Sequence, residues 1–501
     1  MLRRKAYQRL LDWKTRKGHK CLLVKGQRQV GKTFIIDLFA RENYEHYVYM
    51  DLSKDEMMRN AFSGSLDVDS IIKAIGVYRG FMDLVPHKTI IFMDEIQSCP
   101  RARESLKSFS LDGRYDVIAS GSLIDVVHDP KDGRMPVLPV GYEEHIRMYS
   151  LDFEEFLWAR DITDGIIDEI RSKIKNKEPL GTAYLDALNG HFRDFMIVGG
   201  MPAAVSQFVK EGNYSSASSI VSDIIETDRQ DMMMYNDGVN GMKIARCLDS
   251  IPSQLSDTNK KFMYSRVDGS GSRSAARMYS DNMLWIERSG IGNYCHRLRS
   301  LEIPLETNSD RDQFRVYMSD TGMLINMMGN RAMVAVYDGD DHFNMGALME
   351  NAVAECLMKA GHALHYYRVN SGSDMMELDF VIELGLELAV IEVKSGKDRS
   401  APSISKVSRY PQVERRIMFE RGDVRVDEDG LEHYPLFASA FIDSMEREWR
   451  RPGFRPGTNG LSASSAEFRF TPDASSFRRA SVRRSPDGPP SRLCRTPSSG
   501  P

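Results

Sequence analysis

The sequence contains no uninterrupted apolar run of the ~18 residues that a membrane-spanning helix requires. Its basic start, Met1–Lys5, leads into Asp12 and Trp13 without the apolar core of a secretory signal. We therefore expect a cytoplasmic protein that has no membrane partner.

Cysteine is scarce and scattered, and no two cysteines form a C-x-x-C pair. Such spacing fits neither a zinc site nor a disulfide framework, so we expect reduced and mostly buried thiols. The six residues are Cys21, Cys99, Cys247, Cys295, Cys356 and Cys494.

The chain also lacks an overall positive charge. Its formal net charge is −4, and residues 450–501 hold ten arginines against three acids, which leaves −11 for residues 1–449. Nucleic-acid binding would therefore require a local basic patch, because the bulk charge opposes it. The 501 residues are too many for one core and suggest roughly three domains.

Strands and helices alternate over the first 150 residues. Apolar runs predict strands at 21–24, 47–52, 89–93 and 115–119, and helical spacing predicts helices at 1–20, after residue 33 and at 68–84. This alternation predicts an α/β domain with a parallel sheet and helices on both faces.

The pattern becomes helical after residue 150. Helices are expected at 152–158, 181–196 and 214–234, and Gly199–Pro202 separates the last two. A helix at 273–283 followed by a short hairpin within 284–301 is typical of a winged-helix module, whose second helix enters a major groove. Its exposed candidates are Ser274, Arg277 and Ser280. An ordinary helical packing domain explains the same pattern equally well.

Mixed α/β character returns at 345–440, where we expect a helix at 345–361 and strands at 378–382 and 388–394. After residue 448 the sequence is rich in Ser, Pro, Gly and Arg, and it cannot bury a core. We expect this tail to be disordered.

A phosphate-binding loop lies between the first predicted strand and its helix. Its glycines, Gly26 and Gly31, let successive backbone N–H groups face phosphates, while Lys32 reaches the β- and γ-phosphates and the Thr33 hydroxyl coordinates Mg²⁺. The helix begins at Thr33, so that its positive end lies beneath the anion. The complete ATP-binding loop is Gly26, Gln27, Arg28, Gln29, Val30, Gly31, Lys32 and Thr33.

Two carboxylates follow the third predicted strand, as in a Walker B motif. We expect Asp94 to hold Mg²⁺ through water and Glu95 to act as the general base on the attacking water. Two solvated turn residues are the alternative. Ser120 and Ser122 follow the fourth strand and are candidates for a position near the γ-phosphate, with Ser122 assigned a catalytic role; Arg134 is either a phosphate contact or a surface loop residue.

A second candidate site lies in the C-terminal α/β region. If the strands at 378–382 and 388–394 pair antiparallel, Asp379 and Glu392 can converge on one Mg²⁺, with Lys394 on the same strand face as Glu392. Two acids and a lysine at this spacing form a PD-(D/E)XK nuclease signature, and Glu350 supplies the additional acid. A nuclease-like domain of this kind either cleaves nucleic acid or only binds a partner. The alternative explanation of these residues is an edge strand with its polar side in solvent.

Together these residues resemble the prokaryotic AAA-superfamily ATPases with an uncharacterised, restriction-endonuclease-like C-terminal domain. The resemblance covers most of residues 1–440 and implies no known substrate. Hexameric rings are common among relatives of this core, so a homo-oligomer is expected as one possible state. The markers are Gly26–Thr33, Ile91–Gln97, Ser120–Leu123, Gly133–Arg134, Phe153–Leu157, Gly199–Pro202, Tyr317–Met323, Glu350–Asn351 and Glu392–Gly396.

The resemblance implies five segments: an ATPase core at 1–150, a helical lid at 151–236, a winged-helix segment at 237–335, a nuclease-like domain at 336–445 and a tail at 446–501. The leading hypothesis is an ATP-driven switch that acts on double-stranded DNA or other nucleic acid through its C-terminal domains. The alternative is an ATPase that regulates or remodels a protein partner, with the nuclease-like domain as a binding module. An ATP-gated nuclease is a third possibility.

Overall fold

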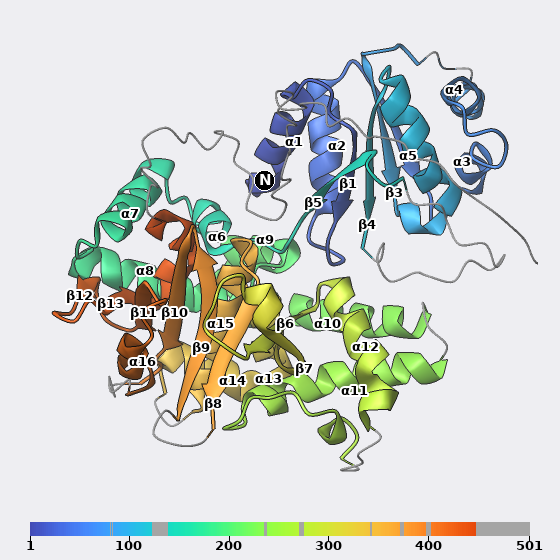
Figure 1. The fold of residues 1–501 in the computed structure, drawn as a ribbon. Coiled ribbons are helices and arrows are strands. Elements are labelled where there is room, and N and C mark those ends of the chain that lie inside the picture. Colours follow the sequence, from blue (N-terminus) through green and yellow to red (C-terminus); the bar gives the residue numbers. More distant parts are fainter. Residues whose placement is uncertain are drawn as a thin grey trace, which may run out of the picture. The chain divides into compact units, whose positions relative to one another are not determined.

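The computed structural model describes residues 1–80, 82, 84–122, 139–234, 238–269, 275–340, 343–370, 375–396 and 402–446 (Figure 1). Of the predicted features, Arg134, Ser274 and the tail beyond residue 446 lie outside these ranges. The described residues belong to one compact unit. Within the described ranges, no helix has the length and apolarity to cross a bilayer.

Five parallel strands form the N-terminal sheet, in the order β2-β3-β4-β1-β5. The prediction of a parallel sheet is confirmed, and its four predicted strands are each found within two residues of their expected bounds. The fifth was missed because its sequence, Glu-Glu-His-Ile-Arg, is mostly charged and only its isoleucine is buried. The strands are β1 (Cys21–Lys25), β2 (His46–Asp51), β3 (Thr89–Asp94), β4 (Asp116–Gly121) and β5 (Glu143–Arg147).

Helices cover both faces of this sheet because successive strand residues point to opposite sides (Figure 1). Leu22 and Val24 of β1 join one core with α1 and α2, whereas Cys21 and Leu23 join the other core with α3, α4 and α5. A strand buried on both faces needs the continuous apolar run that the sequence shows. The helices are α1 (Lys5–Thr15), α2 (Lys32–Asn43), α3 (Glu56–Asn60), α4 (Val68–Tyr78) and α5 (Pro100–Asp112), with a 3₁₀ turn, η1 (Ile96–Ser98). The helices predicted at 1–20 and 68–84 are therefore shorter than expected.

Helices dominate from residue 153 to residue 289. The first begins with a capping box, in which the Asp152 side chain accepts from the Glu155 amide and the Glu155 side chain accepts from the Asp152 amide. Gly200 lies between two later helices, and this position requires glycine because a Cβ there would lie 2.1 Å from the Leu151 carbonyl oxygen. The elements are α6 (Phe153–Ala159), α7 (Asp164–Asn176), α8 (Thr182–Val198), α9 (Pro202–Glu211), α10 (Tyr214–Met234), α11 (Gly238–Leu255), η2 (Tyr264–Arg266) and α12 (Ala275–Ser289).

A second, mixed sheet of eight strands follows, in the order β12-β13-β11-β10-β9-β8-β6-β7. Its strands are β6 (Gly292–Leu298), β7 (Ser309–Met318), β8 (Leu364–Val369), β9 (Met376–Leu384), β10 (Glu387–Val393), β11 (Arg415–Glu420), β12 (Arg425–Val426) and β13 (Glu432–Pro435). The helical elements of this region are η3 (Leu305–Asn308), α13 (Thr321–Met328), α14 (Asn330–Asp338), α15 (Met345–Lys359), α16 (Pro402–Lys406), η4 (Val407–Arg409) and η5 (Leu436–Met445).

The hairpin predicted within residues 284–301 is placed differently in the structure. Helix α12 continues to Ser289, and the antiparallel pair is β6 with β7, whose second strand begins only at Ser309. Leu301 and Leu305 are buried in the connection, so they resemble strand residues in the sequence without belonging to a strand. Strand β6 also pairs in parallel with β8, so one sheet contains strands from both sides of the expected boundary at 335/336.

Candidate nucleotide site and acidic cluster

The loop between β1 and α2 requires glycine at two positions. Gly26 has φ +157°, and a Cβ there would lie 2.0 Å from the Met148 carbonyl oxygen. Gly31 precedes α2 with φ +91°, a left-handed conformation that favours glycine. The backbone therefore turns sharply from the end of β1 to the start of α2, as the P-loop prediction requires.

Lys32 is buried at the start of α2 and is held by the loop itself. Its Nζ donates to the carbonyl oxygens of Gly26 and Gln27, both at 2.8 Å. Burial lowers the pKa of Lys32 to about 8, although the carboxylates of Glu95 and Asp94 oppose this shift. A cation that has lost its hydration gains from an anionic partner, so this ammonium group is well placed for a phosphate.

Asp94, at the end of β3, joins the P-loop to the neighbouring strands. Its Oδ2 accepts from the Thr33 hydroxyl at 2.8 Å and from the Tyr49 hydroxyl at 3.2 Å. The Ser120 hydroxyl of β4 donates to its other oxygen, Oδ1. Thr33 and Asp94 were both predicted from sequence as magnesium ligands, and the fold brings them into contact.

The oxygen atoms of Thr33 and Asp94 fit Mg²⁺, which prefers oxygen ligands. Within the described parts of the chain, no three or more Asp, Glu, His or Cys side chains are grouped so that they could hold a metal ion. Magnesium at this site would therefore depend on phosphate oxygens and water for its remaining ligands, as is usual for nucleotide-bound Mg²⁺.

Glu95 follows directly in a left-handed conformation, with φ +51°. Its amide donates to Asp94 Oδ1 at 3.1 Å, and the Gln97 side chain donates to its carboxylate. A non-glycine residue in this conformation stores roughly 1–3 kcal/mol of strain, and such residues gather at functional sites. The geometry is compatible with the predicted general base, which stays a prediction.

Ser120 and Ser122 have different surroundings. Ser120 is fully buried against Asp94, whereas Ser122 lines a small cavity with Gln27 and Arg28 of the P-loop. The Ser122 hydroxyl finds no hydrogen-bond partner among the described residues. A buried hydroxyl in this state can bind water or a ligand oxygen.

Two aspartates of α10 contact the P-loop, and the sequence analysis missed both. Gln27 Nε2 donates to Asp228 Oδ2 at 3.1 Å, and Arg28 Nε lies 2.6 Å from Asp231 Oδ2. Both carboxylates are 3% exposed. The available signal was their spacing of three residues on the same side as the apolar Ile224 and Met232, because buried acids on an apolar helix face need partners.

The pKa values of these two aspartates are raised. Burial raises the pKa of Asp228 to about 7; the hydrogen bond from Gln27 opposes the shift and the charge of Asp231 adds to it. Burial also raises the pKa of Asp231, against the influence of Arg28. Near pH 7, Asp228 is therefore divided between its neutral and charged forms.

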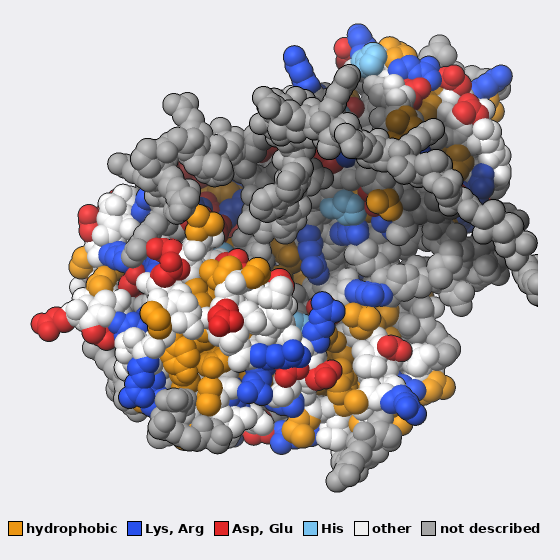
Figure 2. All heavy atoms as spheres, in the orientation of Figure 1, with side chains coloured by type: hydrophobic (Ala, Val, Ile, Leu, Met, Phe, Trp, Pro, Cys, Tyr) orange, Lys and Arg blue, Asp and Glu red, His pale blue; other side chains and the backbone are white. Residues whose placement is uncertain are grey.

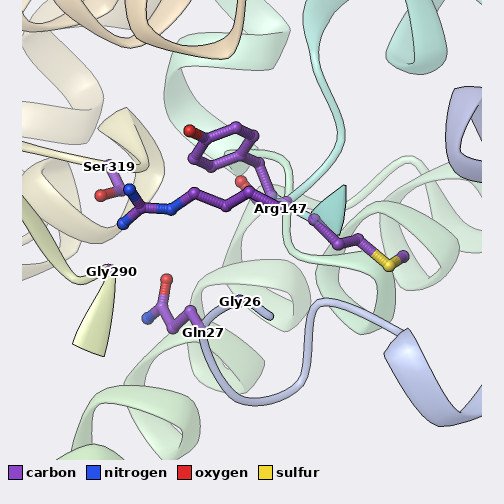
Figure 3. A pocket seen from close by; sticks show the side chains of 8 residues that line it. Gly26, Gln27, Arg147, Gly290 and Ser319 are labelled. Carbon is purple, nitrogen blue, oxygen red and sulfur yellow. The ribbon is translucent and has the colours of Figure 1, made fainter. Parts of the chain in front are cut away.

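A cavity of about 370 Å³ adjoins the P-loop at the carboxyl ends of β1, β4 and β5. Its lining residues are Lys25, Gly26, Gly121, Ser122, His145, Ile146, Arg147, Glu287, Arg288, Ser289 and Gly290. A smaller pocket shares Gly26, Arg147 and Gly290 with it. In Figure 3 the Arg147 side chain extends toward Ser319, and Gln27 rises from the P-loop beside Gly26.

The predicted acidic cluster of the C-terminal region is also assembled by the fold. Strands β9 and β10 pair antiparallel, with Ile391 opposite Phe380. Glu392 and Asp379 are the next residues along these two strands, and Asp379 Oδ2 accepts from the Val393 amide at 3.0 Å. Lys394 Nζ lies 2.8 Å from Glu392 Oε1.

Cations from outside the predicted motif neutralise these acids. Lys260 is ion-paired with Glu350 and lies 4.0 Å from Asp379. Arg315 of β7 is fully buried, 3.9 Å from Glu350 and 3.8 Å from Asp379. The Tyr317 hydroxyl also donates to Glu350, at 3.1 Å.

These contacts fit a charge-balanced network better than a magnesium site, because the chain already supplies cations to Glu350 and Asp379. Glu392 differs from them. Burial and the neighbouring Asp379 raise its pKa to about 7, and its Oε2 has no hydrogen-bond partner among the described residues. Magnesium binding by Asp379 and Glu392 stays a prediction.

Comparisons with known proteins support the nucleotide site. A sequence profile for an AAA domain matches residues 18–157, and profiles for domains of unknown function match residues 189–333 and 345–437. No curated protein sequence matches the chain significantly.

Two of the solved structures that are similar to this chain are a Walker-type ATPase and a DNA complex. The Walker-type ATPase PABY2304 of Pyrococcus abyssi is 11% identical, with a TM-score of 0.37 over 66% of this chain and 96% of that chain. The Aeropyrum pernix ORC1 protein in complex with DNA is 13% identical, with a TM-score of 0.28 over 68% of this chain and 93% of that chain. At these scores the two structures carry no argument about this protein.

The AAA profile covers both the P-loop and the Walker B strand, so the region around residues 18–157 is a P-loop ATPase domain of the AAA type. The match over residues 345–437 does not assign a nuclease-like fold, and the match over residues 189–333 does not assign a winged helix.

We predict opposite effects for two substitutions in the nucleotide site. Lys32→Ala should weaken ATP binding on the order of 100-fold, because it removes the cation that meets the phosphates. Glu95→Gln should retain bound ATP and lower turnover on the order of 100-fold or more, because it removes a general base. Equilibrium binding and single-turnover hydrolysis measure the two effects. Lys54→Ala, at a largely exposed lysine, is the control; wild-type behaviour of both site variants would refute the assignment.

We also predict a pH-dependent effect of Asp228 on stability. Its folded pKa of about 7 lies above its unfolded value of about 3.9, so its favourable contribution is complete below pH ~4 and is lost as the pH rises through 7. The melting temperature of the wild type should therefore fall more between pH 5 and pH 8 than that of Asp228→Asn, by an amount equivalent to roughly 2–4 kcal/mol. Asp223→Asn, at an exposed position of the same helix, should behave like the wild type.

Proposed function

We propose that this protein is an ATP-driven conformational switch that acts on nucleic acid. The observation that carries the proposal is the contact between the P-loop and α10, through Gln27–Asp228 and Arg28–Asp231. A change in the P-loop on nucleotide binding therefore acts directly on α10, a helix outside the parallel sheet. A nucleotide site with such contacts can change the arrangement of the rest of the chain.

The chemistry follows from the residues at the carboxyl edge of the sheet. The P-loop amides and Lys32 would bind the β- and γ-phosphates, and Thr33 and Asp94 would hold Mg²⁺, which would neutralise charge on the phosphate oxygens. Glu95 accepts a proton from water as the water oxygen attacks the γ-phosphorus. The bond to the ADP oxygen breaks, and ADP and phosphate are released.

Three features support nucleic acid as the target. Two helices, α11 and α12, precede the β6–β7 hairpin, which is the order expected of a winged-helix segment. Arg277 on α12 is exposed, and Ser280 on the same helix is half-buried. Figure 2 shows Lys and Arg side chains on one face of the molecule, interspersed with acids, so the binding surface would be a local one.

Double-stranded DNA should stimulate ATP hydrolysis by the purified protein if this proposal is correct. Turnover measured with and without DNA at two salt concentrations tests it, because phosphate contacts make affinity fall steeply with salt. Arg277→Ala should reduce the stimulation and leave the basal rate unchanged, whereas Lys32→Ala should remove both. Hydrolysis that is indifferent to DNA at low salt would contradict action on nucleic acid while preserving the ATPase.

The second candidate function is regulation or remodelling of a protein partner. Its specific support is the neutralised acidic cluster, in which Lys260 and Arg315 already pair with Glu350 and Asp379. Such a cluster can stabilise a binding module without cleaving a phosphodiester. The charge of −11 over residues 1–449 favours the same interpretation.

A cleavage assay separates a binding module from an ATP-gated nuclease. If the C-terminal region only binds, plasmid DNA should remain supercoiled with the wild-type protein, ATP and either Mg²⁺ or Mn²⁺. Nicking that disappears in Asp379→Ala but persists in Lys54→Ala would instead establish the nuclease. The Lys54 control is exposed on the turn after β2, where it pairs with Asp51.

A further inference from the structure

The two aspartates of α10 lie in a polar enclosure beside the P-loop. Gln27, Arg28, Ser122, Asp228 and Asp231 line it, together with Trp285, Ser289 and Ile291. Its free volume of about 10 Å³ is close to the minimum that one water molecule needs. Two parts of the ATPase site, the P-loop and the end of β4, therefore share one small space with α10.

Besides Arg28, which is ion-paired with Asp231, three buried polar atoms of this enclosure lack a hydrogen-bond partner among the described residues. They are the hydroxyl oxygen of Ser122, Oδ1 of Asp231 and Nε1 of Trp285. Buried polar atoms almost always form hydrogen bonds with protein or water. We therefore expect this enclosure to hold a water molecule or another small polar group. The other oxygen of Asp231 is engaged by Arg28, which orients the carboxylate.

The charged groups around the aspartates come from several elements. Arg28 and Lys32 of the P-loop region lower the pKa of Asp228, whereas Asp231 on its own helix raises it. Glu95, after β3, raises the pKa of Asp231. The sulfur of Met323 on α13 lies 3.6 Å from Gln27 Nε2 and is the neutral neighbour on that side.

A triphosphate on the P-loop would add several negative charges next to these carboxylates. Like charges in a buried site repel strongly, because little water is present to screen them. The same phosphates attract Lys32 and Arg28, the two cations that partly balance the aspartates. ATP and the α10 carboxylates therefore compete for the same positive groups.

We propose that Asp228 and Asp231 are positioning residues of the ATPase site, which hold Gln27 and Arg28 of the P-loop and release them when ATP binds. Helix α10 thereby responds to the nucleotide. This inference rests on the proposed function, since it requires that the P-loop binds ATP.

Helix α10 contacts two neighbouring helices, α11 and α13, through which a change in its position can be transmitted. Arg229 of α10 is ion-paired with Asp249 of α11 at 2.6 Å. A Cβ on Gly241 of α11 would lie 2.7 Å from the Met232 carbonyl oxygen, so the two backbones are in close contact. Asn326 of α13 donates to the Ser218 carbonyl at 2.9 Å. A movement of α10 therefore affects both α11 and α13.

The first test is ATP affinity as a function of pH. Between pH 6 and pH 8.5, wild-type affinity should fall as Asp228 becomes charged, and Asp228→Asn should remove part of this fall. At pH 8.5 the variant should bind ATP about tenfold more tightly than the wild type, as expected for the loss of one repelling charge. Asp231→Asn should tighten binding as well. The matched control is Asp223→Asn, which keeps the wild-type profile.

The second test needs no substitution, so it remains valid if a variant fails to fold. Hydrogen exchange of the full chain is compared with and without a slowly hydrolysed ATP analogue and Mg²⁺. Amides in the α10 segment 224–234 should exchange faster with the nucleotide, while those of β1 and α2 exchange more slowly.

The outcomes distinguish the inference from the function on which it rests. Nucleotide binding with unchanged α10 exchange, and affinities of both variants within twofold of the wild type at pH 8.5, would overturn the inference alone. If the wild type binds no ATP, the proposed function fails and the inference fails with it. Faster α10 exchange together with tighter binding by the variants would establish it.

Discussion

The carboxylate of Asp94 is the interaction on which the nucleotide site depends. It lies at the end of a strand buried on both faces, and it is 4% exposed. An unpaired charge there would be strongly destabilising, but the hydroxyls of Thr33, Tyr49 and Ser120 donate to it. These donors come from α2, β2 and β4, so one side chain sets the spacing between the P-loop and three strands. The same oxygens are the ones that a hydrated Mg²⁺ would need.

Buried charges occur in both candidate sites but are balanced differently. In the nucleotide site, Lys32 is surrounded by loop carbonyls, and its lowered pKa indicates a cation with an incomplete set of anionic partners. In the acidic cluster, Lys260 is ion-paired with Glu350 and Arg315 with Glu377. A cation of the first kind gains by meeting an anion, whereas one of the second kind already has a carboxylate partner. This contrast is why the first site is assigned to ligand chemistry and the second remains open.

Helix α10 connects the parallel sheet to the rest of the chain. Its aspartates contact the P-loop, and its other faces contact α11 and α13, which belong to the region that contains the eight-stranded sheet. Strands on both sides of residue 336 share that sheet, so the segments after the helices are structurally continuous. A local change at the P-loop can therefore be transmitted to the C-terminal region through the contacts of α10.

Much of this protein could be read from its sequence, where the determinants are local. Continuous apolar runs predicted β1 and β3, and a mostly apolar run predicted β4. The glycines at 26 and 31 predicted the P-loop, because strand burial and positive φ constrain residue type directly. Asp379 and Glu392 were expected to converge if their two strands paired antiparallel, and the strands do pair in that way.

Only the tertiary structure decided the contacts between distant segments. Nothing near Asp228 or Asp231 in the sequence points to residues 27 and 28, about two hundred positions away, and nothing near Lys260 points to Glu350. Strand β5 is too polar to be recognised alone, and its place beside β1 follows from pairing with a strand over one hundred residues earlier. Residue type records whether a position is buried or sharply turned, whereas the partner of a buried charge depends on the packing of the whole chain.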